Sequence, residues 1–274
     1  MRVLVDGRGQ DLLEVVDRGL QYGDGLFETI RLRDERPCQW QRHLDRLACG
    51  AGRLGIPSPD PKSLAAEIAD AAHGLDDGVL KLILTRGRGG RGYRPPDSPQ
   101  PRRILLTYPL PLDPLGSWEE GVSVRYCRTP ASINPALAGI KHLNRLDSVL
   151  GSREWSDPTI AEGLMLDPSG GVVGGTRTNL FLWDGRRLLT PPVDRSGIAG
   201  TRRALTMDLA AQSGLDCVES RLEPADLSLA RGLFLTNAIV GIWPVRELAG
   251  HSFDLTRLPW SLLDAVRQAA QTPG

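Results

Sequence analysis

Hydrophobic residues recur with two different periods along the chain, which predicts a mixed α/β (α+β) protein. Residues 26–32 alternate strictly between one face and the other, as a strand with a single buried face does. Residues 39–54 instead repeat their apolar positions with helical spacing. Residues 79–86 are almost continuously apolar, so we expect them to form a central strand.

The rest of the chain continues this mixture of strands and helices. In chain order, the other predicted elements are strands at 2–5 and 11–16, a helix at 61–73, strands at 103–108 and 122–127, a helix at 143–155, a strand at 162–166, a strand pair broken by two glycines at 172–183, a strand at 187–190, a helix at 201–212, strands at 232–236 and 242–245, and a terminal helix at 258–270. The proline-rich stretch 109–118 is the predicted linker. We therefore expect an N-terminal α/β domain over 1–108 and a C-terminal domain over 119–274.

The composition is that of an ordinary globular protein. Of the 274 residues, 41% are hydrophobic and 24% are charged, and the formal net charge is zero. No overall field attracts nucleic acid or an anionic membrane, which argues against both partners. The four cysteines and four histidines lack the spacing of a disulfide framework or a zinc site. The N-terminal residues do not form a signal sequence and the apolar runs are shorter than a membrane span, so we expect a soluble cytoplasmic protein.

Glu28 lies on the otherwise apolar face of the strand at 26–32. A carboxylate in this position is either a buried functional group or the partner of an arginine. The arginine partner is the more common outcome, because an unpaired buried charge is costly. The sequence leaves both interpretations open.

Lys141 stands out because lysine is rare in this chain. There are three lysines, Lys62, Lys81 and Lys141, against thirty arginines. A lysine amine can lose its proton and act as a nucleophile, whereas arginine stays protonated. The apolar neighbours of Lys141 disfavour its charged form. The alternative interpretation is an ordinary lysine at a strand end, with its amine reaching into solvent.

Two further stretches have features of anion-binding segments. Residues 86–94 contain four glycines, four arginines and Tyr93. They form either a solvated surface loop, which the sequence favours, or a lid that binds a carboxylate through its arginines. The glycine before the helix at Thr201 exposes backbone N–H groups suited to a phosphate, although this signal is weak alone. A reactive lysine and a phosphate-binding helix start together suggest pyridoxal 5'-phosphate (PLP) chemistry.

Four motifs resemble those of a known class of PLP enzymes. Almost the whole chain is similar to the branched-chain and D-amino-acid aminotransferase class, which implies the two-domain fold type IV. Within this class it most resembles the aminodeoxychorismate lyases. The first two motifs are shared by the whole class, and the last two are more typical of the lyases. The motifs are DRGLQYGDGLFET (17–29), HLDRL (43–47), LTRG continuing to RGY (84–87 and 91–93) and GIKHLNRL (139–146).

The resemblance implies roles for individual residues. Lys141 would form the Schiff base with the cofactor and later move protons, and Arg46 would hold the cofactor phosphate. The backbone N–H groups of Thr201 and Arg202 and the turn Asn237-Ala238 would also bind the phosphate. The residues implied near the substrate are Phe27, Thr29, Arg91 and Tyr93. The implied reaction converts 4-amino-4-deoxychorismate to 4-aminobenzoate and pyruvate, a step towards folate. The resemblance also implies a homodimer, with PLP between the two domains.

Gly174 departs from the pattern of the class. It stands where the class carries a glutamate that pairs with the pyridine nitrogen of the cofactor. Without that charge the cofactor ring is a poorer electron sink. Either the lyase reaction tolerates the loss because aromatisation drives it, or the residue was engineered, or the chemistry has been lost or changed. A D-amino-acid or branched-chain aminotransferase and a PLP-independent protein therefore stay open as alternatives.

Overall fold

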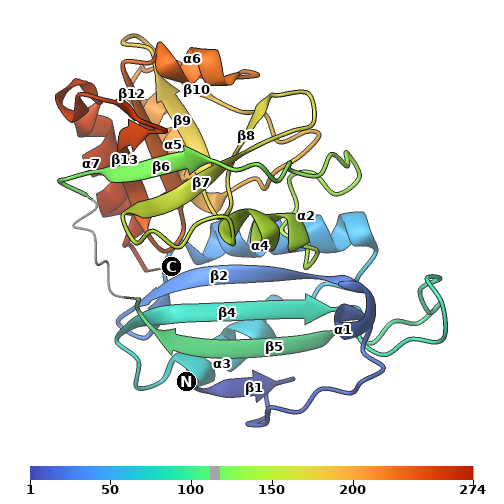
Figure 1. Ribbon diagram of the computed structural model, residues 1–274. Coiled ribbons are helices and arrows are strands. Elements are labelled where there is room, and N and C mark those ends of the chain that lie inside the picture. The colour runs from blue at the N-terminus through green and yellow to red at the C-terminus, as the bar shows by residue number, and fades with distance from the viewer. Residues whose placement is uncertain (112–117, 274) are drawn as a thin grey trace. The chain divides into compact units, whose positions relative to one another are not determined.

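The computed structural model describes residues 1–111 and 118–273, and the chain divides into two compact units (Figure 1). The first unit comprises Met1–Pro111 with Ile140–Asn144 and Gln271–Gly274, and the second comprises Leu112–Gly139 and Arg145–Ala270. The segment that carries Lys141 thus belongs to the first unit, whereas the sequence-based boundary placed it in the C-terminal domain. Residues 112–117 of the predicted linker lie outside the described part of the chain.

An antiparallel sheet of five strands organises the first unit. The strands follow the order β1 (Val3–Val5), β5 (Arg102–Pro109), β4 (Asp77–Thr85), β2 (Gly25–Arg33) and β3 (Arg36–Pro37). β4 is central, as its continuous apolar run predicts. β2 pairs with β4 along its whole length, so the strand predicted at 26–32 is confirmed.

The two faces of β2 differ, as the alternation predicts. Every second residue from Leu26 to Leu32 is buried. The amphipathic helices α2 (Trp40–Leu54) and α3 (Pro61–Ala72) pack on this side of the sheet. The opposite face carries Phe27 and Thr29, which are only partly buried. This second face is therefore less buried than the first, which is committed to the core.

The segment before β2 differs most from the prediction. Residues 11–16 form no strand, because their apolar side chains meet no partner: Leu12 and Val15 are 75% and 77% exposed. The residues after them form the short helix α1 (Arg18–Tyr22), which the sequence analysis missed because its glycines indicate a turn. The side chain of Asp17 caps this helix by accepting from the backbone N–H of Gly19 at 2.7 Å.

A mixed sheet of nine strands organises the second unit. The strand order is β11-β10-β9-β12-β13-β6-β7-β8, with β14 paired to β13. The strands are β6 (Val122–Tyr126), β7 (Ile160–Leu166), β8 (Val172–Gly175), β9 (Asn179–Trp183), β10 (Leu188–Thr190), β11 (Cys217–Glu219), β12 (Gly232–Asn237), β13 (Gly241–Leu248) and β14 (His251–Ser252). The short strands β11 and β14 were not predicted.

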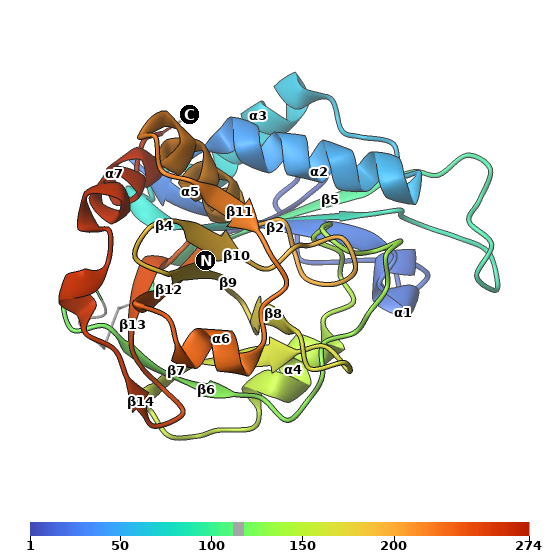
Figure 2. The same ribbon diagram turned by 90° about the horizontal axis from the view of Figure 1, so that it is seen from above.

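Two apolar clusters fill the two faces of this sheet, whose strands Figure 2 shows from above. One cluster contains Phe181 and Phe234, whose stacked rings have centroids 4.9 Å apart. It lies against α5 (Thr201–Gln212) and α7 (Trp260–Ala270). The other cluster contains the alternate leucines of β9 and β12 with Leu227. Burial on both faces explains why these strands read as nearly continuous apolar runs.

The remaining elements of the second unit are short. They are α4 (Leu146–Ser152), α6 (Pro224–Ser228) and the 3-10 turn Leu255–Arg257. A longer helix was predicted over 143–155, but it begins late because Leu143 donates its backbone N–H to the carbonyl of Gly25 instead. In the described part of the chain, no helix is long and apolar enough to cross a membrane.

Candidate functional site

Lys141 is held against the partly buried face of β2, which carries Phe27 and Thr29. The backbone N–H of Phe27 donates to the carbonyl of Lys141 at 2.9 Å, and that of Leu143 donates to the carbonyl of Gly25 at 3.0 Å. The Nζ atom of Lys141 lies 4.3 Å from the centroid of the Phe27 ring. Strand pairing thus fixes the backbone at the lysine, and the ring shields one side of the amine. The reactive role of Lys141 stays a prediction.

A second lysine lies on the same aromatic ring. The Nζ atom of Lys81 is 5.7 Å from the centroid of Phe27, and Lys81 is the β4 partner of Thr29. Two of the three lysines of the chain therefore meet at one side chain. The sequence analysis singled out Lys141 alone, although the scarcity of lysine pointed equally to Lys81. The positive charge of Lys81 at this face attracts anionic groups.

On the opposite face of β2, Glu28 is fully buried between His43 and Arg46 of α2. His43 Nδ1 lies 2.6 Å from one carboxylate oxygen, and Arg46 Nε donates to the other at 2.8 Å. Burial alone would raise the pKa of Glu28, but the charge and hydrogen bonds of Arg46, with the hydrogen bond of His43, hold it at about 2. The structure therefore confirms the interpretation of Glu28 as the partner of an arginine, Arg46.

The ion pair also orients Arg46, the predicted phosphate ligand. Glu28 engages the Nε and one terminal nitrogen of the guanidinium, and a guanidinium carries five N–H donors in a rigid fork. Arg46 is 11% exposed. The pairing is compatible with phosphate binding, which stays a prediction for Arg46.

Acidification from pH 4.5 towards pH 2 is expected to remove the stability that Glu28 contributes. Its pKa is lower in the folded than in the unfolded chain, so the contribution is fully present above pH 4.5 and is lost as the pH falls through the folded value. Urea unfolding of the wild type and Glu28→Gln at a series of pH values measures this. The difference in their free energies of unfolding should shrink on acidification, and a constant difference would contradict the expectation.

In the second unit, the predicted phosphate segments come together. α5 begins at Thr201 after Gly200, which provides no side-chain cap, and the first N–H groups of a helix point outwards along its axis. The side chain of Arg202 donates to the carbonyl of Ala238 at 3.4 Å. Asn237 shapes that turn through Oδ1, which accepts from the backbone N–H of Val240 at 2.8 Å. A helix start beside a polar turn is a donor set that suits a phosphate.

Gly174 lies in β8 with a φ of +150°, a conformation that side-chain-bearing residues rarely adopt. A Cβ atom there would lie 2.9 Å from the carbonyl oxygen of Thr178. The backbone is therefore adapted to glycine at this position. Glu162 is the carboxylate in this region: a Cβ on Gly175 would lie 2.8 Å from its carboxyl carbon.

Glu162 anchors the turn between β8 and β9. It is fully buried, and it accepts hydrogen bonds from the hydroxyl of Thr176 at 2.6 Å and from that of Thr178 at 3.0 Å. The sequence analysis found only neutral residues around Gly174, because Glu162 is distant in the chain. These hydrogen bonds commit Glu162 to holding the turn in place.

Arg91 and Tyr93 are exposed on the loop after β4. Tyr93 is 85% exposed, and its ring meets that of Tyr22 edge to face at 5.5 Å. In the described part of the chain, Arg91 has no hydrogen bond or ion pair through its side chain. The exposed side chains fit the surface-loop interpretation, yet the backbone of the loop is bound to α1 by Arg18, which the sequence analysis did not single out.

Comparison with known proteins identifies the family. Residues 25–248 match the family described as amino-transferase class IV. The crystal structure of 4-amino-4-deoxychorismate lyase from Pseudomonas aeruginosa has a TM-score of 0.93 and 45% identity, covering 98% of this chain and 100% of that one. The aminodeoxychorismate lyase of Vibrio harveyi is 31% identical, over 89% of this chain and 90% of its own length. A putative branched-chain-amino-acid aminotransferase of Methanocaldococcus jannaschii is 35% identical, over 91% and 88%. The chain belongs to the amino-transferase class IV family.

Proposed function

We propose that the protein is a PLP-dependent lyase that converts 4-amino-4-deoxychorismate to 4-aminobenzoate and pyruvate. The observation that carries the proposal is the amine of Lys141, held at the Phe27 ring in a chain that resembles a lyase over nearly its full length. When bound, PLP supplies the electron sink for bond changes at the amine-bearing carbon of the substrate.

Lys141 moves the protons in this scheme. Its neutral Nζ removes the proton from the amine-bearing carbon, the C–O bond to the enolpyruvyl group breaks, and the ring becomes aromatic. Lys141 or a water then returns a proton to the departing enol, which becomes pyruvate. No external oxidant or keto acid is needed. The electron pair of the C–H bond enters the aromatic ring, and the electron pair of the C–O bond leaves with the enolpyruvyl group.

We further propose binding roles for the predicted residues. Arg46 and the N–H groups at the start of α5, with the Asn237-Ala238 turn, hold the cofactor phosphate. Arg91 and Tyr93 meet the substrate, whose carboxylates suit an arginine fork. Phe27 and Thr29 form the strand face beneath the reacting groups, where Lys81 adds a positive charge.

Pyruvate release without a keto-acid acceptor tests the proposed reaction. Purified protein with PLP and 4-amino-4-deoxychorismate should form pyruvate and 4-aminobenzoate in equal amounts, followed with a lactate dehydrogenase couple and by chromatography. Adding a keto acid should leave the rate unchanged. Product formation that depends on the keto acid would identify an aminotransferase instead.

Aminotransfer is the second candidate, because a relative with that putative activity is as similar in sequence as one of the lyases. Gly174 bears on this choice. Aminotransfer depends on prolonged storage of electrons by the cofactor, so a missing carboxylate beside the pyridine nitrogen should impair it more than the lyase reaction, which aromatisation assists.

Gly174→Glu is expected to raise aminotransferase activity with D-alanine or branched-chain amino acids. The same change should cost about 1–3 kcal/mol of stability, because a side chain at φ +150° is strained and its Cβ meets the carbonyl of Thr178. Coupled transamination assays and urea unfolding measure the two effects. Gly174→Ala is the matched control: it carries the strain without the charge, so it should lose stability and gain no activity.

The proposal includes a homodimer that works in the cytoplasm, as the resemblance to the class implies. Sedimentation equilibrium of the PLP-loaded protein tests the assembly. A mass near that of one 29.8 kDa chain at assay concentrations would contradict it.

A further inference from the structure

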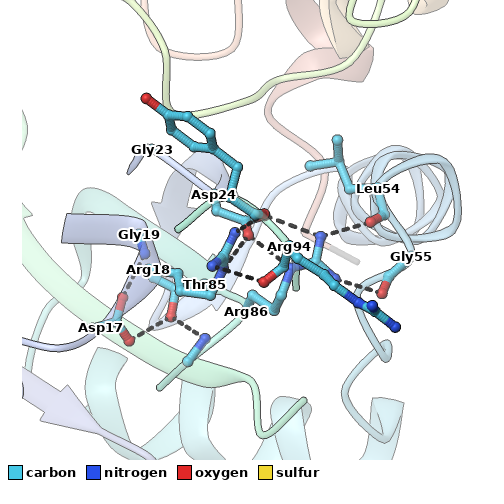
Figure 3. Close-up of polar contacts among 12 residues, drawn as sticks. Asp17, Arg18, Gly19, Gly23, Asp24, Leu54, Gly55, Thr85, Arg86 and Arg94 are labelled. Atoms are coloured by element: carbon cyan, nitrogen blue, oxygen red, sulfur yellow. Dashed lines mark hydrogen bonds and ion pairs between the residues drawn. The ribbon is translucent and has the colours of Figure 1, made fainter. Parts of the chain in front are cut away.

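Arg18 is a buried arginine around which the loop 87–94 folds (Figure 3). Only 3% of the residue is exposed. Its Nε donates to the carboxylate of Asp24 at 2.8 Å. Its terminal nitrogens donate to backbone carbonyls of the loop, to Tyr93 at 2.8 Å and to Gly92 at 3.1 Å. One side chain therefore fixes the loop backbone at successive residues.

The loop contacts the aliphatic part of Arg18 as well. A Cβ atom on Gly89 would lie 2.5 Å from Cδ of Arg18, so only glycine allows the backbone to approach this closely. The backbone N–H of Arg18 also donates to the carbonyl of Gly87 at 2.9 Å. Gly89 thus serves a close approach of the loop to Arg18.

Asp24 connects this arrangement to the rest of the first unit. Arg86 donates to the same carboxylate from Nε at 2.7 Å and to the last carbonyls of α2, including that of Leu54 at 2.7 Å. Burial would raise the pKa of Asp24, but the hydrogen bonds and charges of Arg86 and Arg18 lower it overall. The carboxylate stays ionised at neutral pH, and both arginines remain paired.

The side chains at the tip of the loop are not used in this anchoring. Arg91 and Tyr93 project from a backbone whose carbonyls face Arg18, and Tyr93 rests on Tyr22 of α1. The ring of Tyr22 in turn lies 4.9 Å from the guanidinium carbon of Arg18. A loop rich in glycine and arginine is thereby restrained at its backbone while its cationic and aromatic groups remain exposed.

We infer that Arg18 is a positioning residue that holds the loop 87–94 in the conformation in which Arg91 and Tyr93 meet the substrate carboxylates. The inference rests on the proposed function. A loop ordered before binding loses less conformational entropy when the substrate arrives. Loss of the anchor should therefore weaken substrate binding much more than it slows the chemical step, and KM should respond more than kcat.

Amide hydrogen exchange and steady-state kinetics of Arg18→Ala together test whether Arg18 positions the loop, with Arg88→Ala as the matched control. Arg88 lies in the same loop, but its side chain is exposed and lies 3.9 Å from Glu14. In Arg18→Ala, amides of residues 87–94 should exchange at least about tenfold faster without substrate, and KM should rise about tenfold or more with kcat changed by less than about threefold. Arg88→Ala should change neither quantity.

Gly89→Ala provides a second route if Arg18→Ala fails to fold. It keeps every charge and pushes the loop off the arginine stem, so exchange and KM should move in the same direction. Unchanged exchange in both variants would overturn the inference, as would faster exchange with an unchanged KM. A wild-type protein that releases no pyruvate would overturn the proposed function instead, and the exchange data would still decide whether Arg18 anchors the loop.

Discussion

Lys141→Ala is expected to reduce pyruvate release by about three orders of magnitude or more, because it removes both the attachment point of the cofactor and the group that moves protons. The fold should persist. The backbone hydrogen bond from Phe27 to the carbonyl of residue 141 does not involve the side chain. Initial rates with added PLP measure the loss, and thermal unfolding checks that the variant is folded.

The scarcity of lysine makes this experiment decisive. After borohydride reduction in the presence of PLP, intact mass should show one cofactor attached to the wild type and none to Lys141→Ala. Lys62→Ala is the matched control, since Lys62 is exposed on α3 and should keep both attachment and activity. Lys81→Ala should keep attachment but bind the anionic substrate less well. A Lys141→Ala protein that still holds the cofactor covalently would refute the assignment.

Glu28→Ala is expected to destabilise the folded protein by about 3–5 kcal/mol, because it leaves the positive charge of Arg46 and the polar ring of His43 buried without their carboxylate. The free energy of unfolding in urea at neutral pH measures the loss. The phosphate affinity of the protein should fall as well, since Glu28 orients the guanidinium of Arg46.

Asp77→Ala is the matched control for the Glu28 experiment. Asp77 pairs with Arg31 of β2 at 2.9 Å, but its side chain is 58% exposed. The change should therefore cost less than about 1 kcal/mol. If Glu28→Ala costs no more than Asp77→Ala, the buried cluster does not stabilise the fold as argued. Glu28→Gln should fall between the two, because it keeps the shape and loses the charge.

Local pattern predicted much of the secondary structure. The helix at 201–212 and the alternating strand at 26–32 were found because their periodicity is contained in a few successive residues. The strand predicted at 11–16 was wrong: its apolar residues are present, but no partner strand pairs with them, and Leu12 and Val15 are exposed. The helix α1 was missed, since its stability depends on the cap from Asp17 and on burial of Arg18 rather than on helix-forming residues.

The sequence by itself determined most of the longer strands and helices, that lysine is restricted to three positions, and that the chain resembles PLP enzymes. The tertiary structure decided what those residues face: Lys81 meets Lys141 at Phe27, Arg46 meets Glu28, and the loop 87–94 closes on Arg18. Periodicity reports only neighbours along the chain, whereas these contacts join residues at least 18 positions apart. Only the pairing of strands and the packing of helices bring them together.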